Sequence, residues 1–516
     1  MTVRTFAITV LCAAAVFSTR THAEQRPAPH SSEITRLSQQ NSAEYLELLS
    51  IPNIPAVAAD MQRNADFLER SFRKRGFETK RLDNPAGRPV VVAQLTKHRA
   101  GAKTILFYAH FDGQPVNQQD WSQPSAFQPV IKERNAQGAW KDIGRDRLLS
   151  GPFNPELRVF ARSASDDKAP IMMLLTAMDV LNAQKRAPAI NIKVLLDPEE
   201  EIGSPHLGAT VESNRALFEA DALVVLDGPV HNSGRPTLAF GNRGITQATL
   251  TVFGPRAPLH SGHFGNYVPN PALRLATLLA AMKDDQGRVL IPGYYDGITL
   301  TAADRAVLAK TGDDEAALRK RAGIARAESV GRNYQESLQY PSLNVRGMAA
   351  AAVGEKAANI VPSEAVAELD IRTTPETDGR RLFDLIKQHI EKQGYHFVDA
   401  PPTDEERARY EKLAMFRLGS VEPAQRMPMD SPIGLWALKA LKSAGPEPGT
   451  EPVRIRMMGG TVPTDVLVNA LRLPFILIPT VNADNNQHTY DENLRIGNFV
   501  TGTQTIYSLF VAAYPL

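Results

Sequence analysis

The sequence predicts an α/β protein, in which a mostly parallel β-sheet is flanked by helices and a smaller α+β domain is inserted. Three nearly continuous apolar segments end in acidic residues or histidine, at residues 104–112, 190–201 and 221–228. Such runs are typical of strands buried on both faces of a parallel sheet. The apolar segment 169–186 has the length of a helix and suits a crossover between parallel strands.

The other elements follow from local patterns in chain order. Residues 31–51 begin with a capping serine, and their apolar residues have helical spacing. A second helix is expected from about Ala56 to Arg75, and Gly76 ends it. Segments 245–254 and 365–372 alternate apolar and polar residues like half-exposed strands. Further strands are expected at residues 77–82, 90–95 and 474–480, and further helices at residues 271–282, 379–393 and 496–514.

The chain length indicates two domains, because 516 residues exceed what one hydrophobic core usually serves. The alternating strands, each followed by a helical segment, suggest a small antiparallel α+β unit. We therefore place the inserted domain at residues 240–400 and the larger domain at residues 24–239 and 401–516.

The first 23 residues have the pattern of a secretory signal. Arg4 precedes an apolar run from Phe6 to Phe17, and small residues precede a cleavage point after Ala23. The run is too short to span a bilayer comfortably, so we expect a periplasmic or secreted protein without stable membrane association. The one cysteine, Cys12, lies inside this segment, so disulfides are not expected in the mature chain.

Composition and charge narrow the class of partner. A hydrophobic content of 43% and a charged content of 22% are those of an ordinary soluble globular protein. Removing the signal removes Arg4 and Arg20 and no acid, so 58 Lys and Arg become 56, equal to the 56 Asp and Glu. A nucleic-acid partner needs a basic surface, and this balance predicts none.

Acids and histidines gather where the predicted parallel strands end. In an open α/β sheet the ligand site lies outside the carboxyl ends of the strands. The residues at those ends and in the adjoining loops are His110, Asp112, Asp166, Asp167, Glu199, Glu200, Glu201, Asp227 and His488. So many carboxylates at one edge of the sheet repel one another, and bound cations would offset that repulsion. A mixture of imidazole and carboxylate ligands suits zinc, manganese or cobalt.

Each of these residues also has an ordinary structural interpretation. A single strand-end histidine is usually a hydrogen-bonded surface residue, a glutamate triplet a solvated turn, and an Asp-Asp-Lys sequence a capped helix start. Several strand ends converge on the same chemistry, however, and that favours a functional site. For His206, His231 and His263 we keep the structural interpretation.

Seven motifs together resemble a known enzyme family. They are YAHFDGQPV, SASDDKAP, LLDPEEEIGSPHL, VVLDGP, LHSGHFGN, GGTVPTDV and NQHTYDEN. Their order is similar to that in dinuclear zinc peptidases, which include carnosinase-type dipeptidases, glutamate carboxypeptidases, acetylornithine deacetylase and succinyl-diaminopimelate desuccinylase. The resemblance implies a zinc-exopeptidase-like catalytic domain and a ferredoxin-like lid and dimerisation domain.

The resemblance also implies a site of two divalent metal ions per chain, most simply Zn²⁺, with Mn²⁺ or Co²⁺ as alternatives. By this resemblance His110 and Asp227 hold one ion, Glu201 and His488 hold the other, and Asp166 bridges them.

The remaining implied roles concern the reaction and the substrate. Glu200 acts as the general base, Asp112 orients His110 through its second ring nitrogen, and His260 stabilises the oxyanion, often across a homodimer. The implied substrate-binding residues are Asn359, Arg372, Gly460 and Thr461. The guanidinium group of an arginine such as Arg372 can donate two parallel hydrogen bonds to a free carboxylate.

Four positions depart from the family pattern. Ala161 and Ser163 replace the two glycines of the Gly-Arg-Gly sequence that usually precedes the bridging aspartate, Ala169 replaces the glycine after the lysine, and Asn266 replaces the last glycine of the histidine motif. Glycine reaches backbone conformations that other residues avoid, so these changes affect loops. They leave every implied ligand in place and make substrate preference the open question.

The sequence therefore predicts a two-metal exopeptidase that hydrolyses dipeptides or short peptides with a free C-terminal carboxylate. One alternative is an N-acyl-amino-acid amidohydrolase, since the same site cleaves either amide. The other is a noncatalytic metal-binding protein, which the complete ligand set disfavours.

Overall fold

The computed structural model describes residues 31–445, 450–462 and 464–515. The predicted signal segment lies outside the described residues, so export stays a prediction, testable by N-terminal sequencing of the exported protein for a start at Glu24. In the described part of the chain, no helix combines the length and apolar character needed to cross a membrane.

An eight-stranded sheet forms the larger domain, in the order β1-β2-β7-β3-β8-β20-β9-β19. The strands are β1 (Phe77–Leu82), β2 (Val90–Leu95), β3 (Thr104–His110), β7 (Asn191–Asp197), β8 (Ala222–Val225), β9 (Thr237–Ala239), β19 (Val453–Ile455) and β20 (Phe475–Leu477). β3 pairs parallel with both β7 and β8, and β20 pairs parallel with β8. The predicted mostly parallel sheet is thereby confirmed.

Both faces of this sheet are covered, which explains the uninterrupted apolar runs. Along β3, Ile105 and Phe107 enter one core, while Leu106 and Tyr108 enter another on the opposite face. The first core includes residues of α1 (Ser31–Leu49), α2 (Ala58–Arg73), α4 (Lys168–Ala183), α14 (Pro432–Lys442) and α16 (Ile496–Val511). The second includes residues of α5 (Leu207–Ser213), α6 (Arg215–Phe218) and α15 (Thr464–Leu471).

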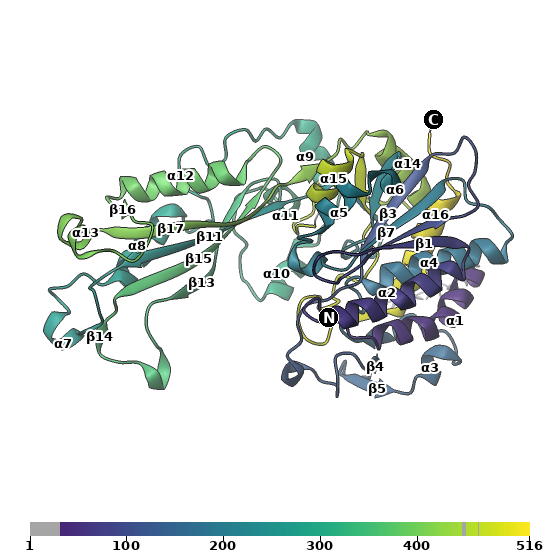
Figure 1. Cartoon of the computed structure of the whole chain (residues 1–516), viewed down its shortest axis with the longest axis horizontal. Coiled ribbons are helices and arrows are strands. Elements are labelled where there is room, and N and C mark those ends of the chain that lie inside the picture. The colour runs from purple at the N-terminus through teal and green to yellow at the C-terminus, as the bar shows by residue number, and fades with distance from the viewer. Residues whose placement is uncertain (1–30, 446–449, 463, 516) are drawn as a thin grey trace, which may run out of the picture.

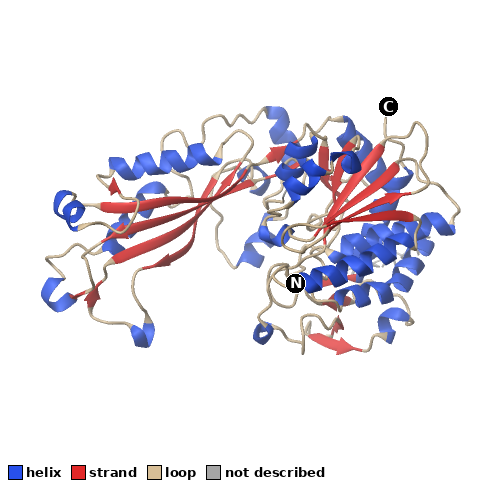
Figure 2. Ribbon diagram, in the orientation of Figure 1, coloured by secondary structure: helices blue, strands red, loops and turns tan. Residues whose placement is uncertain are grey.

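A second domain extends away from the first (Figure 1, Figure 2). Its five-stranded sheet has the order β13-β15-β11-β17-β16, with β11 (Gly244–Phe253), β13 (Ser342–Ala349), β15 (Glu364–Thr373), β16 (His396–Phe397) and β17 (Leu413–Glu422). Side chains from α8 (Pro271–Met282) and α12 (Gly379–Lys392) share one core with this sheet. We call this α+β unit the lid.

The lid sheet does not follow the boundaries expected from the sequence. β17 lies beyond residue 400 and pairs antiparallel with β11, on the side opposite β15, so the lid sheet extends to Glu422. The two passages between the domains, β10 (Gly241–Asn242) and β18 (Gln425–Arg426), pair with each other. One segment of the insertion bonds to the larger domain, for instance through Asp313 and His231. This segment carries α9 (Ala302–Ala309), α10 (Glu315–Ala322) and α11 (Tyr334–Ser337).

A buried charge network joins α1, α2 and α4. The Arg75 side chain is 2% exposed and donates to Glu44 at 2.9 Å and to Asp179 at 2.8 Å. Burial alone would raise the pKa of Glu44, but hydrogen bonds from Arg75 and Ser71 outweigh it and lower the pKa to about 2.

Replacing Arg75 by Gln is expected to lower the free energy of unfolding by about 3 kcal/mol at pH 7, because it leaves buried carboxylates unpaired. The pKa of Glu44 is depressed from 4.5 to about 2, so its stabilisation is present above pH 4.5 and lost as the pH falls toward 2. Urea denaturation at pH 7 and pH 3 should show a smaller loss at pH 3. Arg63→Gln, in a pair whose arginine is 55% exposed, is the control and should cost under about 1 kcal/mol. Equal losses at both pH values would contradict this account.

Candidate metal centre and active site

The carboxyl ends of three adjacent strands position the candidate site. His110 is the last residue of β3, Glu200 and Glu201 begin the 3₁₀ turn η2 (Glu200–Ile202) after β7, and Asp227 follows β8. Because these strands run parallel and in register, their following residues meet at one edge of the sheet. Asp166 arrives from the loop before α4, and His488 from the loop between β20 and β21 (Asn493–Arg495).

Asp166 lies between the two histidines. Its Oδ1 is 2.8 Å from His110 Nε2, and its Oδ2 is 3.0 Å from His488 Nε2. His488 Nε2 is also 3.3 Å from Glu201 Oε2. Each oxygen of one carboxylate thus faces a different imidazole, which is the arrangement a ligand shared by two cations requires.

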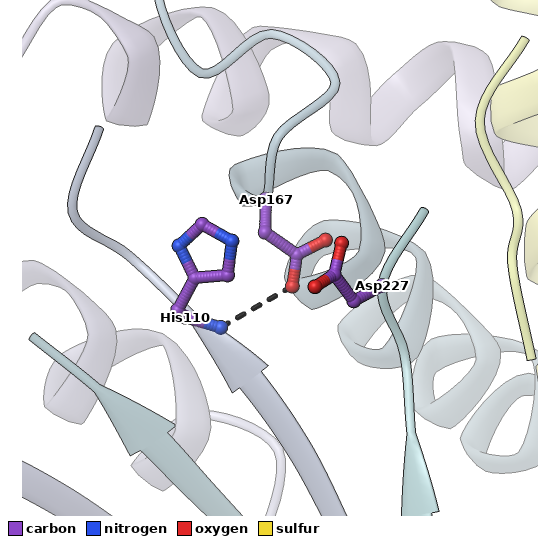
Figure 3. Close-up of side chains that lie close together, drawn as sticks. All are labelled: His110, Asp167 and Asp227. Carbon is purple, nitrogen blue, oxygen red and sulfur yellow. Dashed lines mark hydrogen bonds between the residues drawn. The ribbon is translucent and has the colours of Figure 1, made fainter. Parts of the chain in front are cut away.

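Asp167 is a candidate ligand to which the sequence assigned no metal role, although it was named with the other acids near the strand ends. Donor atoms of His110, Asp167 and Asp227 lie within 4.8 Å of one another (Figure 3). One oxygen of Asp167 accepts the main-chain N–H of His110 at 3.2 Å, and the other is buried without a hydrogen-bond partner. Burial raises the pKa of Asp167 well above its usual range. An unsatisfied buried oxygen beside imidazole and carboxylate donors fits a cation.

Asp112 connects two parts of the site. It is fully buried, and its Oδ1 lies 3.2 Å from His110 Nδ1. The same carboxylate accepts the main-chain N–H groups of Glu200 at 3.1 Å and Glu201 at 3.0 Å. It therefore fixes the orientation of the imidazole and the position of the acidic turn together.

Repulsion among the acids shapes their titration. Burial and Asp166 raise the pKa of Glu201 to about 8 and that of Asp227 to about 6. Burial raises the pKa of Glu200 well above its usual range, against the opposing charge of His110. For Asp166 burial would also raise the pKa, but hydrogen bonds from His110 and His488 outweigh it and hold the pKa low. Divalent cations would relieve this concentration of negative charge.

Glu200 faces the centre of the site. Its Oε2 lies 3.9 Å from His110 Nε2 and its side chain lines the cavity. The neighbouring Glu199 is bound instead by Arg88 at 2.8 Å and His206 at 2.9 Å, away from this cluster. Glu199 and His206 are therefore structural residues, although Glu199 is buried and not part of a solvated turn.

A cavity of about 830 Å³ lies over these groups and is walled by both domains. Arg372 from the lid lines it and donates from Nη1 to Thr461 Oγ1 at 2.8 Å, next to Gly460. Residues in and just before α10 and in α11 also line the cavity, which the sequence did not predict. They include Asp313, Leu318, Arg321, Tyr334 and Gln335. Asp313 is held there by His231 at 3.1 Å.

Two predicted residues lie apart from this cavity. His260 is exposed at the end of β12 (Leu259–His260), which pairs with β14 (Ile360–Val361). Asn359 precedes β14, and its carbonyl accepts the N–H of Ser261. Figure 1 shows β14 and α7 (Ser261–Phe264) at the end of the lid farthest from the larger domain. Neither His260 nor Asn359 is among the described residues that line the cavity.

Known proteins are similar in sequence to most of this chain. The Cys-Gly metallodipeptidase of Schizosaccharomyces pombe is 25% identical over 474 residues, covering 87% of this chain and 91% of that protein. Human Beta-Ala-His dipeptidase is 23% identical over 434 residues, covering 82% and 77%.

Solved structures have the same fold. An M20 family metallo-carboxypeptidase from Sulfolobus solfataricus superposes with a TM-score of 0.70 at 27% identity, covering 91% of this chain and 98% of that one. Human carnosine dipeptidase 1 gives a TM-score of 0.73 at 20% identity, covering 94% and 99%.

The motif resemblance and the fold lead to one conclusion. The family model of "Peptidase family M20/M25/M40" matches residues 106–512, from within β3 to the end of the last helix. This match includes every proposed metal ligand and the whole lid, and it confirms the resemblance inferred from the motifs. The chain belongs to peptidase family M20/M25/M40.

Proposed function

We propose that the protein is a two-metal dipeptidase that hydrolyses dipeptides or short peptides carrying a free C-terminal carboxylate. The observation that carries this proposal is Asp166, whose two oxygens lie 2.8 Å and 3.0 Å from two different histidines, with Glu200 beside them. Relatives named as dipeptidases, one for Cys-Gly and one for Beta-Ala-His, support the substrate class.

The donor set fits two divalent cations, and Zn²⁺ suits its mixture of imidazole and carboxylate. His110 and Asp227 would hold one ion, Glu201 and His488 the other, and Asp166 both. Asp167 adds a further carboxylate beside the first pair. When bound, the ions polarise the scissile carbonyl and make a water molecule more acidic.

The side chains carry the proton transfers. Glu200 accepts the proton of the attacking water and delivers it to the leaving amine, as its place at the edge of the cluster allows. Asp112 keeps His110 oriented and the Glu200 main chain in place. Arg372, braced by Thr461, receives the substrate carboxylate across the cavity.

We also propose a homodimer formed through the lid. β13 is an edge strand of the lid sheet and exposes Val345 at 42% and Met348 at 51%, while Leu273 on α8 is 69% exposed. Exposed apolar side chains on an unpaired edge are typical of an interface. Such a dimer would also explain why His260 and Asn359 lie far from the cavity of their own chain.

One substrate panel tests the reaction. The zinc-reconstituted protein is expected to hydrolyse free dipeptides and to lose that activity with a chelator, because the acid cluster requires cations to activate water. N-acetyl and N-succinyl amino acids serve as matched amides, and C-terminally amidated dipeptides as matched peptides without the carboxylate.

The outcomes separate the competing functions. Amidated dipeptides should react far more slowly than free ones if Arg372 binds the carboxylate. Cleavage of only the acylated amino acids would replace the dipeptidase by an amidohydrolase. Full zinc binding with no hydrolysis of any amide would leave a noncatalytic metal-binding protein.

A further inference from the structure

Glu492 is a fully buried carboxylate that the proposed mechanism does not use. It lies four residues after His488 and directly before β21. Its partners come from a segment more than 300 residues earlier in the chain, Arg162–Asp166, which we call the bridging loop because it ends at Asp166.

Five hydrogen bonds join Glu492 to the bridging loop. Its Oε1 accepts the N–H groups of Ser165 and Asp166 at 2.9 Å each, and the Ser165 hydroxyl at 3.0 Å. Its Oε2 accepts the N–H of Ser163 and Nη1 of Arg162, both at 2.9 Å. Both oxygens are thus engaged, and three of the donors are main-chain groups of one short segment.

The bridging loop needs such an anchor. Ser163 has φ of 60°, a left-handed conformation that costs a non-glycine residue energy. The motif usually has glycine here, so this chain must hold the conformation by contacts. Glu492 binds the Ser163 N–H, and Asn53 donates to the Ser163 hydroxyl at 2.8 Å.

The same contacts fix the main chain of Asp166, whose carboxylate faces both His110 and His488. Arg162 adds a second connection, since it donates to Glu492 and to the carbonyl of Thr489, the residue after His488. One carboxylate therefore ties the loop of the shared ligand to the loop of His488.

We propose that Glu492 is a positioning residue of the metal centre, which sets the place of Asp166 between the two ion sites. The inference rests on the proposed function for the metal centre. Groups behind metal ligands hold them in geometry, and their loss commonly weakens metal affinity or activity about 10- to 100-fold.

Glu492→Gln is the direct test, because the new NH₂ group would face N–H donors whichever way the amide is turned. Metal-free protein is titrated with Zn²⁺ against a chromophoric chelator, at a temperature where circular dichroism shows a folded chain. We expect at least one of the two zinc affinities to fall about 10- to 100-fold. At saturating zinc, kcat should fall while KM changes by less than about threefold, since no substrate contact is altered.

Two further variants separate positioning from simple structural support. Glu492→Asp keeps the charge and should recover part of the zinc affinity. Glu69→Gln is the matched control, because Glu69 is 8% exposed and bonds to Arg73 on α2 and Arg81 on β1 rather than to a proposed metal ligand or its loop. It should lower stability and leave both zinc affinities at the wild-type value.

Wild-type zinc affinities and kcat in folded Glu492→Gln would overturn the inference. If that variant does not fold, Ser165→Ala removes one of the five bonds and should weaken zinc binding severalfold; an unchanged affinity there would overturn it as well. Failure of the wild-type chain itself to bind two zinc ions would instead reject the proposed metal centre.

Discussion

Glu200→Gln is expected to lower kcat by about 10² to 10⁴-fold, the usual loss for a missing general base. Glutamine keeps the shape of the side chain but cannot accept the proton of the attacking water. Both metal ions should remain bound, because Glu200 is not one of the proposed ligands. Peptide hydrolysis and zinc stoichiometry, measured on the same preparation, test both statements.

The adjacent residue provides the control for Glu200. Glu199→Gln makes the same chemical change one position earlier, but Glu199 is bound by Arg88 and His206. It should cost stability and leave turnover within a few-fold of the wild type at a temperature where the protein is folded. Hydrolysis by Glu200→Gln at the wild-type rate would show that the base is another group.

His260→Ala is expected to lower kcat by about 10² to 10³-fold, the usual effect of removing an oxyanion donor. This expectation rests on the proposed homodimer, in which the distal end of one lid would reach the cavity of the other chain. Within its own chain His260 lies on β12, which pairs with β14 at the end of the lid farthest from the larger domain, so the side chain would reach a cavity only through a second copy.

Mixing two inactive variants tests this arrangement. Exchange of subunits between His260→Ala and Glu200→Gln dimers creates mixed dimers in which one site has both functional groups. About a quarter of the wild-type activity should return, since half of randomly formed dimers are mixed and one of their two sites is intact. No recovery after verified exchange, or an active monomer, would exclude a role for His260 across the interface.

The sequence predicted where the acids and histidines gather, because ligand sites in parallel sheets lie at the carboxyl ends of the strands. Strands buried on both faces leave long apolar runs, and functional residues follow where the runs end, as at His110 and Asp227. The pairing of His488 with Glu201 and the shared role of Asp166 came from the motif resemblance, since strand patterns place residues at one edge of the sheet but do not indicate which of them share an ion.

Contacts between distant segments could not be predicted. Glu492 was quoted within a motif, but its role depends on main-chain N–H groups of residues 163–166, more than 320 positions away. Asp167 was named in the acid cluster but given no ligand role, because only the fold shows that its buried oxygen lacks a partner. β17 was missed because its exposed residues and Gly419 weaken the strand pattern, and its pairing with β11 supplies what the local sequence lacks.

The wall formed by α10 and α11 separates two properties of the enzyme. This segment lines the cavity through residues such as Arg321 and Tyr334, yet it supplies none of the proposed metal ligands or the general base. Substitutions there can alter which peptides fit without altering how the bond is broken. Substrate range can therefore diverge among related chains at little cost to the chemistry, and engineering of new specificities should begin with this segment.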